Sequence, residues 1–138
     1  MGRILCLDYG DVRIGVAVSD PTETIASAKK YIKGNVDNYI DNIISIIKEL
    51  NIEKLVIGLP LNLKGRNSQK TKEVKNFYNK MKELLDIPVE LWDERFSTLT
   101  AEQHLREANI KGKKQRELVD SLAAQIILQN YLDSKKYK

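Results

Sequence analysis

Short apolar runs alternate with longer amphipathic stretches along this chain. The runs at 3–8, 12–19, 27–32, 54–58 and 89–93 are rich in Val, Ile and Leu and are bounded by turn-forming residues, which is typical of strands. Apolar positions recur at helical spacing over 36–50, 69–85 and 115–131, and a further helix is expected from a Thr98 or Thr100 cap to Ala108. The pattern therefore predicts three strands, helix, strand, helix, strand and two helices.

The spacing of these elements predicts an α/β fold. Only the turn Asp8–Asp11 separates the first two strands, so they must pair as an antiparallel hairpin. The strand–helix units that follow have right-handed crossovers and place helices on both faces of the sheet. We expect a mixed sheet within one domain, 1–138, because 138 residues fit the usual size of a single domain.

Composition excludes several classes of function. The chain has 42% hydrophobic and 30% charged residues, which is ordinary for a folded protein. One cysteine and one histidine exclude a disulfide framework, structural zinc and a haem with two histidine ligands. Cys6 lies inside an apolar strand and is expected in the core. No apolar run is long enough for a membrane and no cleavable signal is present, so we expect a cytoplasmic protein without a membrane partner.

Charge is distributed unevenly. The net charge is +4 and the isoelectric point about 9.1, and an acidic stretch at 86–102 separates basic stretches at 64–82 and 106–116. This arrangement favours a polyanionic partner, although 64–82 could also be a solvated helix face. The candidates for contact with a nucleic-acid backbone from these stretches are Lys64, Arg66, Lys70, Lys113 and Lys114.

Acidic residues stand where they could share one edge of the sheet. Asp8 ends the first strand, Asp93 and Glu94 end the fifth, and Asp120 lies in the last helix. Ligands of open α/β sheets bind at the carboxyl ends of the strands, and only one of Asp93 and Glu94 can point there because side chains alternate. Grouped carboxylates suit Mg²⁺ or Mn²⁺, and two such ions about 4 Å apart serve phosphoryl transfer. Each acid alone also has a plain structural interpretation, as a turn, corner or helix-terminus residue.

The last helix has a predicted apolar face. Asp120 is expected to open this helix at the border of that face, and the small Ala123 and Ala124 allow close packing. The face is formed by Val119, Leu122, Ala123, Ile126 and Ile127.

Four ordered motifs resemble the YqgF (RuvX) family of the RNase H-like superfamily. They are residues 7–10 with 13–20, residues 56–62 with Gly65, residues 93–98, and residues 120–124, so the resemblance spans nearly the whole chain. It implies an RNase H-like fold with a five-stranded sheet of order 3-2-1-4-5. It also implies a nuclease role in 5′-end maturation of pre-16S ribosomal RNA, with Holliday-junction DNA as the alternative substrate.

The resemblance also assigns site residues. It implies that Asp8, Glu94 and Asp120 are the catalytic acids and hold two divalent ions, Mg²⁺ or Mn²⁺. Neighbouring polar residues that would contact nucleic acid are Arg13, Asn62 and Arg95. The chain departs from the superfamily at residues 58–60, where Gly-Leu-Pro replaces the usual fourth acid, so water or substrate oxygens must complete the ion ligands.

Other functions fit parts of this pattern. The turn after Asp8 resembles the phosphate loop of sugar kinases and actin-like ATPases, but those enzymes enclose ATP between two domains. A non-catalytic RNase H-like protein that binds structured RNA or a ribosome-assembly partner is the main alternative, and metal-dependent cleavage separates it from a nuclease. The sequence leaves monomer and homodimer open, although junction cutting favours a two-fold dimer.

Overall fold

The structure is a computed structural model that describes residues 2–10, 12–34, 37–59, 69–93 and 113–136. For residues 113–120 and 136 it describes the backbone alone. The expected helix ending at Ala108 and the polar loop before 69 lie outside the described residues.

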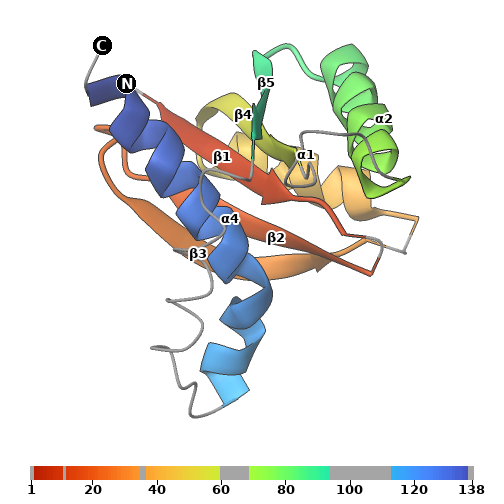
Figure 1. Ribbon diagram of the computed structural model, residues 1–138, viewed down its shortest axis with the longest axis horizontal. Coiled ribbons are helices and arrows are strands. Elements are labelled where there is room, and N and C mark those ends of the chain that lie inside the picture. Colours follow the sequence, from red (N-terminus) through yellow and green to blue (C-terminus); the bar gives the residue numbers. More distant parts are fainter. Residues whose placement is uncertain (1, 11, 35–36, 60–68, 94–112, 137–138) are drawn as a thin grey trace.

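Five strands form one mixed sheet. Strand β1 (Arg3–Asp8) pairs antiparallel with β2 (Arg13–Ser19), which pairs antiparallel with β3 (Ala26–Lys33). On its other side β1 pairs parallel with β4 (Ile52–Leu59), which pairs parallel with β5 (Val89–Asp93). The resulting order, β3-β2-β1-β4-β5, confirms the predicted α/β topology (Figure 1).

Helices cover both faces of the sheet, as the right-handed crossovers require. Helices α1 (Tyr39–Glu49) and α2 (Gln69–Leu84) pack on one face, and α4 (Lys113–Lys136) crosses the other (Figure 1). Within the described part of the chain, no helix is both long and apolar enough to cross a membrane.

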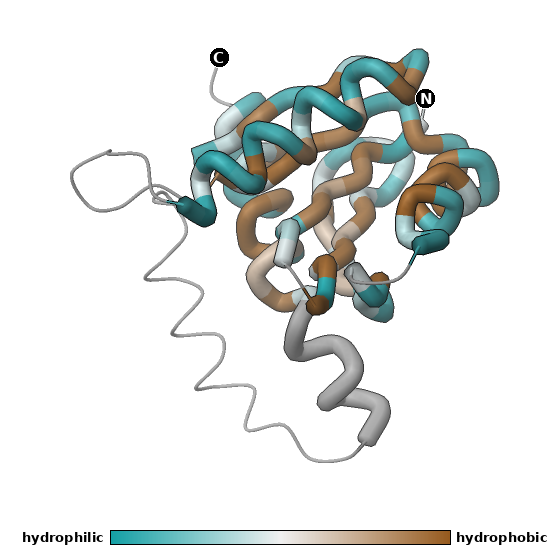
Figure 2. Tube along the Cα trace, turned by 90° about the vertical axis from the view of Figure 1, so that its right-hand side faces the viewer, coloured by the Kyte–Doolittle hydropathy of each residue, from teal (hydrophilic) through white to brown (hydrophobic). Residues whose placement is uncertain are grey.

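The alternation of side chains along β1 divides the core into two layers. Leu5 and Leu7 are buried in the cluster beneath α1 and α2, whereas Ile4 and Cys6 belong to the cluster beneath α4. Figure 2 shows the apolar strands inside and the polar surfaces of the helices outside. Cys6 is fully buried, which confirms its expected place in the core.

Helix α4 differs from its prediction in its start and in part of its buried face. It begins at Lys113, not at 115, so Asp120 lies about two turns inside the helix and does not open it. The predicted Ile126 and Ile127 are buried, whereas the predicted Leu122 and Ala123 are only half-buried. The buried face also includes Ser121, Ala124, Leu128 and Tyr131. The reason is a polar contact to the sheet that hydrophobic periodicity does not detect, described below.

Candidate functional site

Asp8 lies at the edge of the sheet where β1, β4 and β5 end, here called the carboxyl edge. Because Ile4 and Cys6 of β1 pack beneath α4, strand alternation directs Asp8 to the same face. The residue is half-buried, and its carboxylate has no hydrogen-bond or ion-pair partner among the described residues. Its partner across the strand pair is Gly15, which has no side chain. The carboxylate is thus placed to accept a ligand from the α4 side.

A buried hydrogen bond fixes α4 against the sheet close to Asp8. The backbone N–H of Val16 donates to Ser121 Oγ at 3.0 Å, and both residues are fully buried. The bond forms where the register of β2 and β3 shifts, between Ile14 and Val16. Gly15 adjoins Val16 and pairs with Asp8, so the backbone of Asp120, one residue before Ser121, lies near the level of Asp8 along the sheet.

Further along α4, glutamine side chains fix the direction of the helix. Gln129 accepts from the N–H of Ala26 at 2.9 Å and donates to the carbonyl of Thr24 at 3.0 Å, and Gln125 donates to the carbonyl of Ala26 at 3.2 Å. Ala26 pairs with Ser19 at the end of β2 that is remote from the carboxyl edge. Helix α4 therefore starts on the carboxyl-edge side. The backbone at 113–114 lies about 10 Å beyond Asp120 along the helix axis.

Strand β5 separates its two neighbouring acids by face. Glu90 and Trp92 point toward α4, where Glu90 accepts from the Tyr131 hydroxyl at 2.8 Å and Trp92 meets the Tyr131 ring edge-on at 5.2 Å between centroids. Val89 and Leu91 pack instead with the cluster beneath α1 and α2. Asp93 follows this second set, so it lies on the face opposite Asp8. Glu94 lies outside the described residues.

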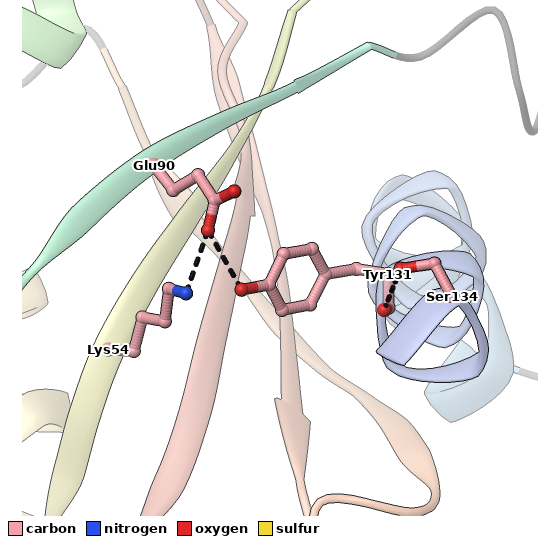
Figure 3. Close-up of polar contacts among 4 residues, drawn as sticks. All are labelled: Lys54, Glu90, Tyr131 and Ser134. Carbon is pink, nitrogen blue, oxygen red and sulfur yellow. Dashed lines mark hydrogen bonds and ion pairs between the residues drawn. The ribbon is translucent and has the colours of Figure 1, made fainter. Parts of the chain in front are cut away.

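A charged network holds the second half of α4 to β4 and β5 (Figure 3). Lys54 Nζ forms an ion pair with Glu90 Oε2 at 2.7 Å, and the same oxygen accepts from Tyr131. Burial alone raises the pKa of Glu90, but the hydrogen bonds from Lys54 and Tyr131 outweigh it and lower that pKa. Burial likewise lowers the pKa of Lys54, yet its contacts with Glu90 and Tyr131 raise it overall. Both groups stay ionised near neutral pH, so the network that ties the second half of α4 to the sheet is maintained.

Basic side chains flank the end of β1, and we call Arg13, Lys33 and Lys70 the basic rim. Arg13 and Lys33 are exposed and directly opposite each other across β2 and β3, with the Arg13 guanidinium 5.3 Å from the centre of the Tyr31 ring. The two cations add positive charge on this side of Asp8. On the other side, Lys70 Nζ lies 5.7 Å from the centre of the Tyr9 ring.

Gly10 is required by the turn itself. A Cβ at this position would overlap the backbone carbonyl oxygen of Arg13. Because that oxygen belongs to the backbone and not to a flexible side chain, it could not move aside. The glycine therefore lets the hairpin close tightly and brings Arg13 next to the end of β1.

The expected site residues are only partly covered by the structure. Asp8, Arg13 and Lys70 gather around the carboxyl edge, and the backbone of α4 brings Asp120 toward it. Among the described side chains, no group of three acids, histidines or cysteines could hold a metal ion. The side chains of Asp120, Lys113 and Lys114 are not described, and the residues wholly outside the described ranges are Asn62, Lys64, Arg66, Glu94 and Arg95.

Sequence reasoning did not single out Lys33 and Tyr31 of the β3 strand. Their partnership with Arg13 depends on the register between β2 and β3, which local pattern does not give. The only signal was the run of lysines and tyrosine at 29–33 in a strand that proved to be the sheet's edge.

The sheet order, the helices on both faces and the acid at the carboxyl edge define an RNase H-like α/β protein. A similar fold occurs in the structure described as "T. thermophilus RuvC in complex with Holliday junction substrate". That chain is 14% identical, with a TM-score of 0.60, and the match covers 100% of this chain and 98% of that one.

The family of the chain is shown by its sequence relatives. The family model RuvX, described as "Holliday junction resolvase", matches residues 2–134. A relative from Thermoanaerobacter pseudethanolicus is 43% identical over 138 residues, 99% of each chain. Another, from Caldanaerobacter subterraneus subsp. tengcongensis, is 44% identical over 97% of this chain and 98% of its own length. Both are named "Putative pre-16S rRNA nuclease".

The chain belongs to the RuvX family, which confirms the resemblance found in its motifs. Membership places it among the nucleases, which are hydrolases of phosphodiester bonds.

Proposed function

We propose that this protein is a metal-dependent endonuclease that cuts a precursor of ribosomal RNA in the 5′-end maturation of pre-16S RNA. The hydrogen bond from Val16 to Ser121 carries the proposal, because it holds the Asp120 segment of α4 near the level of Asp8. The names of the relatives supply the substrate, since both relatives described above are named for pre-16S rRNA.

In this proposal Asp8, Glu94 and Asp120 hold the divalent ions, two Mg²⁺ or Mn²⁺. The donor set suits these ions because carboxylate oxygens are their preferred protein ligands. Asp8 faces α4 at the carboxyl edge, and Asp93 lies on the opposite face, which supports Glu94 as the ligand from β5. When bound, such ions activate a water and neutralise charge on the phosphate.

The protein's own cations position the substrate strand. Arg13 and Lys33 attract phosphates on one side of Asp8, and Lys70 does so on the other. Such contacts set the position of the backbone and carry no sequence information. We propose that the same path is extended by Asn62, Lys64, Arg66, Arg95, Lys113 and Lys114.

A cleavage panel tests this function. The substrates are a short structured RNA, single-stranded DNA and a four-way DNA junction, each with Mn²⁺ or with chelator. We expect Mn²⁺-dependent cutting of the RNA, and a loss of at least about 100-fold in Asp8→Asn and Asp120→Asn. Asp86→Asn is the matched control, because Asp86 is exposed and precedes β5 at the opposite end of that strand.

Each other outcome has a defined meaning. RNA that binds without any Mn²⁺-dependent cutting in the parent protein contradicts the nuclease and favours the non-catalytic binder. If the protein cuts the junction preferentially, it is a nuclease with branched DNA and not RNA as its substrate. The family description "Holliday junction resolvase" favours this alternative substrate. A junction cutter should also be a two-fold dimer, which light scattering would show.

We further propose that residues 1–138 fold as a single domain and that the protein acts in the cytoplasm. The location follows from the proposed substrate, since ribosomal RNA precursors are processed there in bacteria such as those carrying the relatives.

A further inference from the structure

A small pocket lies across the sheet edge from Asp8, on the face covered by α1 and α2. Its volume is about 210 Å³. Three aromatic side chains and three polar ones line it: Tyr9, Tyr39, Phe77, Glu73, Asn76 and Lys80. Pockets for whole cofactors and drug-sized ligands measure about 300–1,000 Å³, so this one suits a single small ring system.

The aromatic side chains of the pocket form a continuous platform. Tyr9 stacks on Phe77 with the ring centres 4.4 Å apart and 25° between the planes, and Tyr39 meets Phe77 at 6.3 Å. Phe77 is 4% exposed and belongs to the core, whereas the two tyrosines are half-buried. The platform is therefore anchored in the core and presents tyrosine surface to the pocket.

Polar groups stand around this platform. Lys80 Nζ lies 3.5 Å from the Tyr39 hydroxyl and 6.0 Å from the centre of its ring. Asn76 and Lys80 are exposed, and Glu73 is half-buried. An aromatic surface with hydrogen-bonding groups and a cation beside it is the combination that binds a stacked base and its phosphate.

We infer that this pocket binds one unpaired nucleobase of the substrate strand, beside the nucleotide held at Asp8. The inference rests on the proposed function, because it assumes that a nucleic acid strand crosses the carboxyl edge. Asp8 and Tyr9 are consecutive, with Cα atoms about 3.8 Å apart, and their side chains lie on opposite faces of the sheet. A strand with a phosphate at Asp8 can therefore place a neighbouring base in the pocket, on Tyr39.

The base in the pocket must be unpaired. Stacking on Tyr39 and hydrogen bonding to Glu73 or Asn76 need a base that has left its duplex. Lys70, above the Tyr9 ring, and Lys80 then lie beside the flanking phosphates. We therefore expect this protein to prefer substrates that are single-stranded next to the site of cutting.

Matched variants test the inference by binding. The chain offers a second lysine–tyrosine pair, Lys82 with Tyr78, whose Nζ-to-ring distance is 5.3 Å and which does not line the pocket. The dissociation constants for a single-stranded RNA and for the duplex of the same sequence are measured without divalent ions. Tyr39→Leu should weaken single-strand binding by about 5- to 100-fold and leave duplex binding unchanged, whereas Tyr78→Leu should change neither.

Exposed lysines repeat the comparison without risk to the core. Lys80→Gln should weaken single-strand binding, and Lys82→Gln should not. Tyr39→Phe keeps the ring and should bind like the parent protein, and thermal melting checks that each variant folds. Equal losses in Tyr39→Leu and Tyr78→Leu, equal losses for single strand and duplex, or no loss in Lys80→Gln overturn the inference.

The two proposals fail separately. If the parent protein cuts with Mn²⁺ in an Asp8-dependent way but Tyr39→Leu binds single strands normally, the base pocket is contradicted and the nuclease proposal stands. If single-strand binding depends on Tyr39 but the parent protein cuts nothing, the pocket proposal stands and the nuclease proposal is contradicted.

Discussion

A single hydroxyl group, that of Ser121, joins the packing of α4 to the geometry of the carboxyl edge. Its oxygen receives the Val16 amide in a fully buried setting, where an unpaired N–H costs about 1–3 kcal/mol. The same bond fixes the backbone of the preceding residue, Asp120, in the N-terminal half of α4, which lies at this edge. One hydrogen bond therefore serves both stability and the proposed catalysis.

Replacing this hydroxyl gives the first prediction. Ser121→Ala should lower the free energy of unfolding by about 1–3 kcal/mol, because the Val16 N–H stays buried without its acceptor. Urea unfolding measures the change. Ser134→Ala is the control, since the Ser134 hydroxyl only donates to the Tyr131 carbonyl of its own helix. Equal stability of Ser121→Ala and the parent protein would contradict the assigned role.

Asp20 illustrates a residue whose charge maintains a turn. Its carboxylate accepts from the N–H of Ile25 at 2.9 Å, from the Thr22 hydroxyl, and from the N–H of Thr24 at 2.7 Å. These hydrogen bonds lower the pKa of Asp20 from 3.8 to about 2. They also hold the link between β2 and β3, in which Glu23 adopts a positive φ of 57°.

The lowered pKa predicts an acid-sensitive turn. Because the folded-state pKa lies below the unfolded value, the ionised group stabilises the fold above pH 4, and this contribution disappears as pH falls from about 4 to 2. Asp20→Asn should therefore be less stable than the parent protein at pH 6, and the difference should shrink toward pH 2. Urea unfolding at several pH values checks this. A difference that stays constant over that range would argue against it.

At the scale of elements, the two-residue period of β5 decides which acid reaches the site. Glu90 and Trp92 contact Tyr131 of α4, while Val89 and Leu91 face the opposite core. Asp93 belongs to the second set and is the partner of Leu59 in β4. The sequence alone left Asp93 and Glu94 open, and the observed faces of β5 favour Glu94.

Neutralising each acid in turn tests this choice. Glu94→Gln should reduce Mn²⁺-dependent cleavage by at least about 100-fold, like Asp8→Asn, because it removes an ion ligand. Asp93→Asn should retain most of the activity, since its side chain faces away from Asp8. Cleavage rates at saturating Mn²⁺ measure both variants. The reverse ranking would show that β5 presents Asp93 to the site.

On the scale of the whole molecule, the proposed substrate path joins distant parts of the chain. The basic rim combines β2, β3 and α2, and the pocket of Tyr9 and Tyr39 adds the β1 end and α1. The net charge of +4 is small, so the placement of cations around Asp8 matters more than their total number.

Salt dependence measures how many rim cations contact phosphates. Each phosphate contact that is lost lowers the slope of log K against log salt by about 0.7 for a single strand. The double variant Arg13→Gln with Lys33→Gln should reduce the slope by about 1.4 and weaken binding to every sequence alike. The control is Lys48→Gln with Lys82→Gln, which removes the same charge from α1 and α2. An equal effect of both double variants would indicate a general charge effect.

Local patterns of residues were enough to predict the secondary-structure elements and the fold class. The first two strands are indicated by the apolar run at 3–8, the alternation at 12–19 and a turn too short for anything but a hairpin. Helical spacing at 36–50 and 69–85 adds the helices of a mixed α/β fold, and each of these signals lies within a few residues. The motifs around Asp8 and Asp120 also gave the family. All of these features could be predicted because each depends on residues that are close together in the sequence.

Contacts between residues that are distant in the sequence became known only from the folded structure. One long-range hydrogen bond turns the Ser121 and Ala124 face of α4 toward the sheet. Strand register places Arg13 opposite Lys33. The packing of β5 places Asp93 on the face opposite Asp8. Hydrophobic periodicity does not contain this information, because it records how apolar each residue is and not which partner a polar group finds. The candidate site lies at a sheet edge, where polar partners determine the geometry.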